Sequence, residues 1–350
     1  MKAIMGLSFV VLFGVFTVLG DGVEARTDGA AKAVPTFAKD IAPILYENCT
    51  SCHRPGDIAP MSFITYRDVR PWARAIKDTV LSGEMPPWLA DRHNSSGEFR
   101  NERVLEQDTI DTLVAWIDGG VPRGEGELPP LPDFPEGWSY EGGPPDYVFE
   151  LPVEYEISAE GEEEYLDFYV PVPWDKDRFA EVIELHPANR SVVHHAGAYV
   201  VDLPPGTRVG ENGMLETLEG EVLDRDEASK IRRKNSTLIE QPVFNQFNLA
   251  GSSKLISYVP GRGVERHRPG TAKRIAAGKY VRFTMHYNPI GQVARDRSKL
   301  GIWFNTKPVT HEVLTRQAGN PVPTNPLGHD IYIVQGEEIV PTLDENGDRV

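Results

Sequence analysis

Residues 279–288 read KYVRFTMHYN, and apolar and polar side chains alternate along this stretch. Val281, Phe283 and Met285 share one face of an extended chain, and the polar residues share the other. Alternation over this length predicts a half-buried β-strand. His286 lies on the polar face of that strand, so filling of the core does not explain it.

Similar short stretches recur up to residue 335 and predict an all-β region. The expected strands are Tyr147–Leu151, Tyr165–Val170, Ala180–His186, Val192–Val201, Lys254–Val259, Lys279–Asn288, Lys299–Asn305 and Ile331–Val334. Turn residues separate most of them, which favours a β-sandwich. Residues 206–250 interrupt the pattern with a polar insertion, expected to be a long loop that carries basic residues between Lys230 and Lys234.

Residues 36–121 follow a helical period instead. The apolar faces of three expected helices are Phe37, Ile41, Ile44 and Leu45, then Trp72, Ile76, Val80 and Leu81, then Ile110, Leu113, Val114 and Ile117. Residues 122–146 are dense in Pro and Gly, which predicts a linker or an extended strap over a surface. The expected fold class is therefore multidomain, with a small helical domain followed by an all-β domain.

The chain has 350 residues and a formal net charge of −16. A protein that binds nucleic-acid backbones needs a basic face, so this balance argues against a nucleic-acid partner. Residues 1–25 begin with Lys2, continue as an apolar run and end in small residues, which predicts a secretory signal peptide. The run is short of the roughly 20 residues that span a bilayer. We therefore expect a periplasmic or secreted protein with no stable membrane insertion after cleavage.

The stretch Cys49-Thr50-Ser51-Cys52-His53 has the C-x-x-C-H pattern of covalent c-type haem attachment. In that chemistry two thiols bind the porphyrin and the histidine becomes an axial iron ligand. A redox dithiol gives no reason for the histidine, and a zinc site lacks a second ligand pair nearby. The motif therefore predicts haem c on Cys49 and Cys52, with His53 as axial ligand, and a cytochrome c domain over residues 36–121.

A second axial ligand of the haem is expected from a methionine. Met85 lies in GEMPPW, residues 83–88, where two prolines stiffen the loop and can hold a thioether in place. Met61 is the alternative, although a core methionine that fills a gap is the simpler interpretation there. We therefore expect Met85 as the second axial ligand, and a haem held by His and Met is typical of electron transfer.

Two adjacent histidines, His194 and His195, lie in the apolar stretch VVHHA, and His286 lies far along the chain. Neighbours on a regular strand point to opposite faces, so joint ligation requires a bulge, a strand end or a local twist. Three neutral imidazoles without a thiolate suit copper or zinc. Structural histidines remain the alternative interpretation. His186 is a weak candidate for a supporting contact, and the other histidines are expected to be structural or exposed.

The stretches CHRPGDIAP (52–60), GEMPPW (83–88), SVVHHA (191–196), YVPG (258–261) and MHYNP (285–289) occur in this order. In this combination the sequence resembles bacterial proteins that join a cytochrome c domain to a copper type II, ascorbate-dependent monooxygenase. The β part, residues 147–335, is similar to the amino-terminal half of that family, which includes peptidylglycine α-hydroxylating and dopamine β-monooxygenases. The resemblance implies a jelly-roll-like sandwich in which His194, His195 and His286 bind copper.

The family also has a second β domain, where a His-x-His pair and a Met bind the copper that activates oxygen. After Asn305 this chain has only His311 and His329 and no methionine. Residues 336–350 are therefore expected to be a polar tail or the truncated start of that second domain.

The resemblance implies the electron-delivering part of a copper-dependent monooxygenase that uses O2. Its electron donor would be a periplasmic partner, and its small-molecule substrate is unknown. Two alternatives stay open: a stand-alone periplasmic electron-transfer protein without hydroxylase activity, and a binding module whose histidines are structural.

Overall fold

A computed structural model describes residues 33–88, 102–134, 136–224, 226–228, 230, 253–319 and 333–341. The expected signal peptide lies outside these residues, as do His93, His329 and the last residues of the expected tail. In the described part of the chain, no helix is both long enough and apolar enough to cross a membrane.

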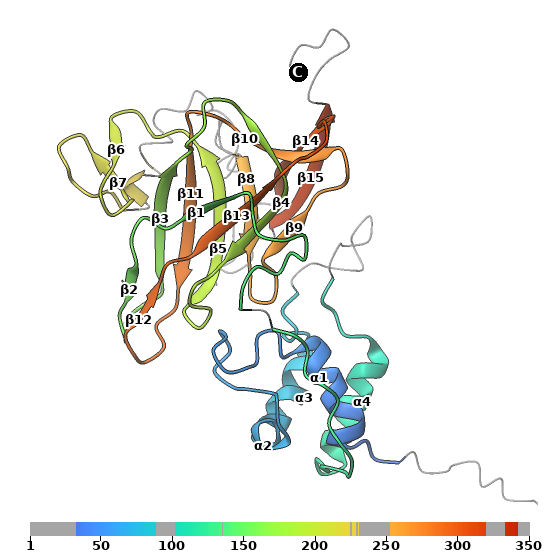
Figure 1. The fold of residues 1–350 in the computed structure, drawn as a ribbon. Coiled ribbons are helices and arrows are strands. Elements are labelled where there is room, and N and C mark those ends of the chain that lie inside the picture. Colours follow the sequence, from blue (N-terminus) through green and yellow to red (C-terminus); the bar gives the residue numbers. More distant parts are fainter. Residues whose placement is uncertain are drawn as a thin grey trace, which may run out of the picture. The chain divides into compact units, whose positions relative to one another are not determined.

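The helices with defined bounds lie between residues 37 and 118 and are short (Figure 1), and residues 226–228 are helical as well. They are η1 (Phe37–Ile41, a π-helix), α1 (Ala42–Asn48), α2 (Tyr66–Val69), η2 (Arg70–Trp72, a 3-10 helix), α3 (Ala73–Ser82) and α4 (Gln107–Asp118). Thr65 and Asp68 form a reciprocal capping box at the start of α2. Gly83, at a φ of 75°, ends α3 in the left-handed conformation that glycine adopts without strain.

The helical core agrees with the sequence pattern at most positions, and it differs at a few. Phe37, Ile41, Leu45 and Leu113 are buried, as expected. Trp72 and Leu81 are exposed, which corrects the expected face of the second helix: Trp72 precedes α3, and Leu81 is turned about 100° from the buried Val80. Trp116, which the pattern missed, is fully buried. The expectation of a cytochrome c fold rests on the haem motif rather than on this arrangement of helices.

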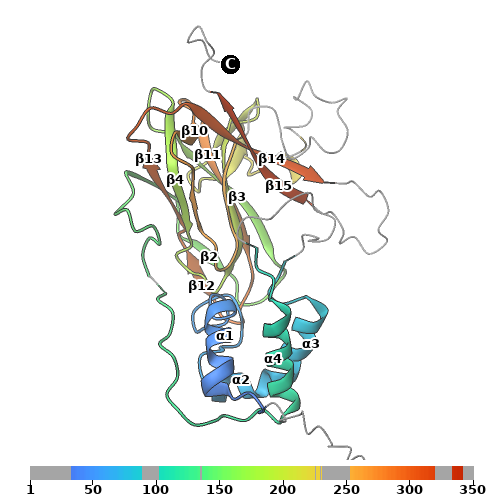
Figure 2. The ribbon, with the colours of Figure 1, turned by 90° about the vertical axis from the view of Figure 1, so that its right-hand side faces the viewer.

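The β region begins at residue 147, and its strands form two main sheets (Figure 2). The seven-stranded sheet has the order β1-β13-β4-β10-β14-β15, and β9 pairs with β4. Its strands are β1 (Tyr147–Glu150), β4 (Arg178–His186), β9 (Val264–Arg266), β10 (Thr271–Ile275), β13 (Lys299–Phe304), β14 (His311–Gly319) and β15 (Ile333–Pro341). The four-stranded sheet has the order β3-β11-β5-β8, with β3 (Glu164–Pro171), β11 (Tyr280–Tyr287), β5 (Val193–Val201) and β8 (Ser253–Tyr258).

One apolar cluster joins the two sheets. From the larger sheet it takes buried residues such as Phe149, Ile183 and Ile302, and from the smaller sheet Phe283 and Met285. Two inner faces that share a core make this region sandwich-like, as the sequence predicted. The alternation along β11 is also confirmed, because Val281, Phe283 and Met285 are all buried in that cluster.

Residues 138–143 of the Pro- and Gly-rich segment lie over the larger sheet as an extended strap. The backbone amides of Ser139 and Tyr140 donate to the buried carboxylate of Glu184 on β4. Trp138 packs against Trp303, and the Trp303 indole N–H donates to Gly143. The sequence left open whether this segment is a linker or an extended strap, and residues 138–143 form a strap.

The sequence pattern missed several short strands. They are β2 (Tyr155–Ile157), β6 (Thr207–Val209), β7 (Leu215–Thr217), β9, β10 and β12 (Ala294–Asp296), and the pattern also missed the longer β14 and most of β15. The first part of the expected loop at 206–250 is thus a small β6–β7 hairpin, while residues 231–252 lie outside the described residues. Residues 336–341, expected to belong to a tail, form the end of β15.

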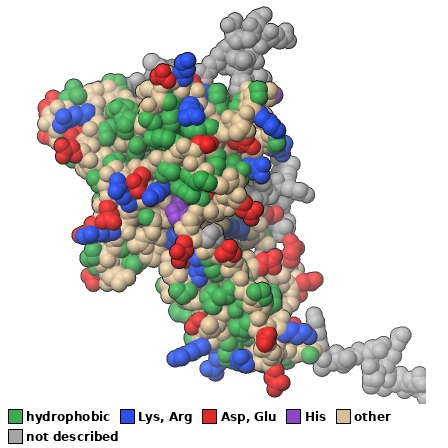
Figure 3. All heavy atoms as spheres, in the orientation of Figure 1, with side chains coloured by type: hydrophobic (Ala, Val, Ile, Leu, Met, Phe, Trp, Pro, Cys, Tyr) green, Lys and Arg blue, Asp and Glu red, His purple; other side chains and the backbone are tan. Residues whose placement is uncertain are grey.

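Acidic and basic side chains intermix on the face drawn in Figure 3. On that face the net negative charge of the chain is therefore not gathered into one block.

Candidate functional site

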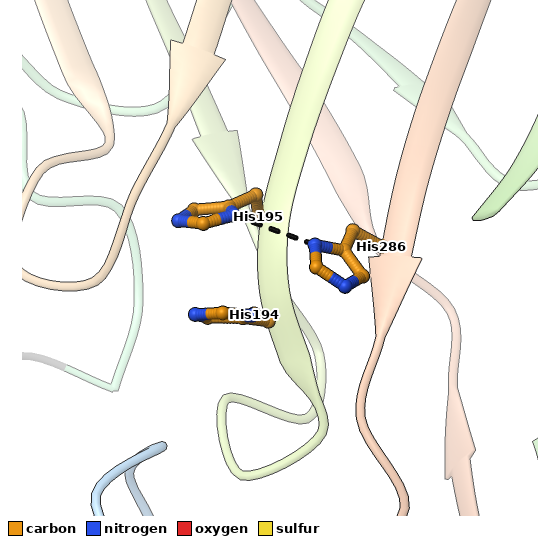
Figure 4. A group of neighbouring side chains, drawn as sticks. All are labelled: His194, His195 and His286. Carbon is orange, nitrogen blue, oxygen red and sulfur yellow. Dashed lines mark hydrogen bonds between the residues drawn. The ribbon is translucent and has the colours of Figure 1, made fainter. Parts of the chain in front are cut away.

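The three histidines singled out from the sequence come together on one sheet (Figure 4). His194 and His195 belong to β5, and His286 belongs to β11, the neighbouring antiparallel strand. One ligand atom from each ring lies within 4.8 Å of the others. Within the described residues, this is the one group of three or more His, Cys, Asp or Glu side chains close enough to hold a metal ion.

A one-residue bulge brings the adjacent histidines to the same side. His286 pairs with His195, but the next residue, Tyr287, pairs with Val193, so His194 is the extra residue on β5. Val193 and Tyr287 are buried in the sandwich core. Since a regular strand would turn His194 toward the core, the bulge is what places its imidazole beside His195. This is one of the irregularities that joint ligation required.

The ring nitrogens converge as ligands around one ion would. Nδ1 of His286 lies 3.4 Å from Nδ1 of His195. Two nitrogens that each lie about 2.0 Å from a metal at a tetrahedral angle are about 3.3 Å apart, so the observed spacing fits. Nδ1 of His194 is buried and has no hydrogen-bond partner among the described residues. A buried ring nitrogen without a hydrogen-bond partner, beside two other imidazoles, fits a metal ligand better than a structural histidine, whose nitrogens are normally hydrogen-bonded.

The electrostatic surroundings favour neutral imidazoles. Burial, and next the neighbouring His194 and His286, lower the pKa of His195 to about 4, although part of the residue remains exposed. Burial also lowers the pKa of His194, and the nearby His286 adds to that effect. Neutral imidazole is the form that binds transition metals, so these two ligands are ready to bind at neutral pH.

Two side chains of the β3 region contact His286, and sequence analysis identified neither. Oε2 of Glu163 lies 2.7 Å from Nε2 of His286. The ring of Tyr165 stacks on the ring of His286 at 3.9 Å between centroids and 20° between planes. Both contacts follow from the pairing of Tyr165 with His286 in the β3–β11 register. No local pattern marks them, because that register becomes known only when the sheet is formed.

A buried carboxylate holds the turn that leads into β5. Asp296 on β12 accepts hydrogen bonds from the backbone amides of Ala188 and Asn189. It also accepts from the Tyr287 hydroxyl and from both the amide and the hydroxyl of Ser298. Asp296 therefore ties the chain just before the bulge to the end of β11, close to His286 in sequence.

The haem motif forms one compact turn at the end of α1. The amides of Cys52 and His53 both donate to the carbonyl of Cys49. Burial raises the pKa of both thiols, that of Cys49 to about 12. A redox-active dithiol needs a lowered thiol pKa, so this environment argues against that alternative. The neutral, free thiols fit haem attachment, and the His53 ring stacks on Phe63 at 4.3 Å.

The two candidate axial methionines differ in their surroundings. Met61 packs against the helical core, which agrees with its interpretation as a core residue. Met85 follows α3, its amide donates to the carbonyl of Thr79, and 37% of the residue is exposed. Of the two methionines, Met85 is therefore the one whose side chain does not pack in the helical core.

The remaining described histidines lie apart from the cluster. His186 packs against Trp138 of the strap, and His267 is buried. His311 begins β14, beside Thr310. Among the described contacts of His186, the weak candidate for a supporting contact, none is with the three clustered histidines.

Comparison with known protein families found no family that matches this chain, and comparison with curated proteins found no match either.

Proposed function

We propose that this chain is an exported oxidoreductase that binds haem c and copper and delivers electrons for copper-dependent hydroxylation of a small molecule by O2. The observation that carries the proposal is the bulge at His194, which turns two adjacent imidazoles toward His286. The resemblance of the HHA and MHYNP stretches to the copper monooxygenase family favours copper over zinc.

The proposal assigns a separate role to each site. Haem and copper, when bound, each supply a one-electron couple. Cys49 and Cys52 would hold the porphyrin covalently, and His53 and Met85 would be its axial ligands. His194, His195 and His286 would hold copper through three neutral nitrogens. The substrate and the oxygen chemistry are assigned to no residue of this chain.

The proposal also extends to domains, partner and location. Residues 36–121 would form a cytochrome c domain, and residues 147–335 a jelly-roll-like copper domain, joined through residues 122–146. The motif that attaches haem and the leader at residues 1–25 both agree with export, where a periplasmic partner would supply electrons. Residues 138–143 pack on the larger sheet, which limits the freedom of the connection at its end next to the β region.

Metal analysis of the full chain tests the copper site. Expressed in a host that attaches haem c, the protein is expected to bind close to one copper per chain after reconstitution. His286→Ala should weaken copper binding by about 100-fold or more, because loss of a ligand costs more than loss of an outer contact. His311→Ala, a histidine outside the cluster, should bind copper as the original chain does. A chain that takes up no stoichiometric copper would overturn the proposal.

Oxygen consumption separates the enzyme from the stand-alone electron carrier. Ascorbate should reduce both centres in the loaded protein, and reoxidation by O2 can then be followed with and without candidate small molecules. Consumption of O2 coupled to a hydroxylated product supports the monooxygenase assignment. A reversible haem couple with bound copper and no coupled product supports the carrier.

A further inference from the structure

Glu163 lies immediately before β3 and reaches across the sheet to His286. Its Oε2 is 2.7 Å from Nε2 of that ring. Glu163 is exposed, with 46% of its side chain accessible, whereas only 8% of the His286 side chain is accessible. Because the carboxylate is exposed to water, a pair of this kind contributes little to the free energy of unfolding. The main consequence of the contact is that it decides which nitrogen of the imidazole carries the proton.

The bond to Glu163 determines which nitrogen of His286 carries the proton. An ionised carboxylate only accepts hydrogen bonds, so Nε2 must be the donor. In a neutral imidazole the other nitrogen, Nδ1, then presents its lone pair. Nδ1 is the atom that faces His195 at 3.4 Å. Glu163 is exposed, and an exposed glutamate carboxyl is ionised at neutral pH.

A second contact restricts the ring itself. Tyr165 stacks on His286 at 3.9 Å, nearly parallel, and so limits rotation of the imidazole out of its plane. Glu163 and Tyr165 come from the same short stretch, and the β3–β11 register places both against His286. Stacking limits the tilt of the ring but does not choose between its two tautomers. Glu163 alone makes that choice.

We propose that Glu163 is a positioning residue of the metal centre, which holds His286 as the Nε2–H tautomer so that Nδ1 is the metal ligand. This inference rests on the proposed copper site and adds a role that none of the three ligands performs. A carboxylate on the far nitrogen of a ligating histidine orients the ring and makes it a stronger donor. The same carboxylate should therefore stabilise Cu(II) relative to Cu(I).

The test compares Glu163→Gln and Glu163→Ala in the full haem-loaded chain. Gln keeps an acceptor oxygen but loses the charge, while Ala loses both. We expect copper affinity to fall by about 10- to 100-fold in Glu163→Ala and by less in Glu163→Gln. The Cu(II)/Cu(I) midpoint potential should rise in both variants, because the imidazole becomes a weaker donor. A residue with only a structural role would not move the potential in this way.

Glu162→Gln is the matched control. Glu162 is the neighbouring residue, it is exposed, and the substitution removes the same charge. The described part of the chain gives it no bond to the three imidazoles. Glu162→Gln should therefore leave copper affinity and potential unchanged. A shift as large as that of Glu163→Gln would mean that general charge, rather than the bond to His286, is responsible, and would overturn the proposal.

A measurement without metal separates this inference from the copper proposal. In the copper-free full chain labelled with ¹⁵N-histidine, the NMR shifts of His286 report its tautomer. The original chain should show the Nε2–H form, and Glu163→Ala should lose that preference. If the tautomer is unchanged in Glu163→Ala, the inference fails whether or not copper binds. If the tautomer responds but no variant binds copper, only the copper proposal fails.

Discussion

The two candidate redox sites of this protein are built in opposite ways. In the C-x-x-C-H motif, Cys49, Cys52 and His53 lie within five consecutive residues, and one compact turn after α1 arranges them. In the histidine cluster, His195 and His286 are 91 positions apart, and a sheet brings them together. The first site depends on residues that are adjacent in sequence. The second depends on the register of β5 against β11 and on the bulge at His194.

This difference predicts different sensitivities. A local turn tolerates changes elsewhere in the fold, because its hydrogen bonds join residues close in sequence. A site assembled from a sheet fails whenever the register or the bulge fails, since a shift of one residue moves every side chain to the other face. Three predictions, ordered from the largest expected effect to the smallest, test the comparison.

Replacing both thiols, Cys49→Ser with Cys52→Ser, should abolish covalent haem. No other cysteine is present to form the thioether bonds. Haem staining on a denaturing gel measures the loss, which is expected to be complete. Copper uptake by the histidine cluster should persist in the folded part of the preparation. Loss of copper binding in the same variant would show that the two sites do not form independently.

Asp296→Ala should disturb the histidine cluster, which is assembled from two strands, and should leave the C-x-x-C-H motif intact. Loss of the five hydrogen bonds that Asp296 accepts leaves buried donors, including the Tyr287 hydroxyl, without their partner. The free energy of unfolding of the β region should fall by about 3 kcal/mol. Copper affinity should fall as well, while haem attachment stays intact. Denaturant unfolding followed by tryptophan fluorescence, together with a copper titration, measures both effects.

Ser298→Ala is the matched control for Asp296→Ala. It removes one of the donors to the same carboxylate and should cost about 1 kcal/mol. If the two variants are equally stable, Asp296 does not organise the turn before β5.

The smallest expected effect is a pH dependence that comes from His195. Its pKa is about 4 in the folded chain, against an ordinary value near 6.5, because burial and then His194 and His286 disfavour the charged form. Below pH 6.5 the unfolded chain binds a proton that the folded chain does not bind, so this contribution to stability is lost as pH falls from about 6.5 to about 4. Partial exposure of His195 keeps the effect small.

Urea unfolding of the metal-free chain and of His195→Asn at several pH values isolates this contribution. It is the difference between their free energies of unfolding. The difference should decline as the solution is acidified over that range. A difference that is flat with pH would mean that the neighbouring imidazoles and the partial burial of His195 do not disfavour its charged form.

Much of the β region could be predicted from alternation alone. The strands around Phe149, Ile183, Val200 and Phe283 occur where alternation placed them, because burial of one face requires a period of two. The helical pattern succeeded at most positions, such as Phe37, and failed at Trp72 and Leu81, since a period of 3.6 indicates a face but not where each helix starts. The missed strands are mostly three to five residues long, too short for a period to show.

The candidate sites divide in the same way. The C-x-x-C-H motif is complete in one stretch, so its residues could be named from the sequence with no knowledge of the fold. The three histidines could be named as candidates, and the need for a bulge or similar irregularity could be stated, but the bulge could not be located. Glu163, Tyr165 and Asp296 carried no signal, because their partners lie on other strands.

The amino-acid order by itself indicated the helical region and the strands with a long alternating pattern, and it placed the C-x-x-C-H motif, because these depend on neighbours along the chain. Only the tertiary structure decided that His194 is the extra residue, that Nδ1 of His195 faces Nδ1 of His286, and that Glu163 reaches the far nitrogen of His286. Those contacts depend on the register between strands, and the burial of two whole sheet faces sets that register rather than any residue of the site.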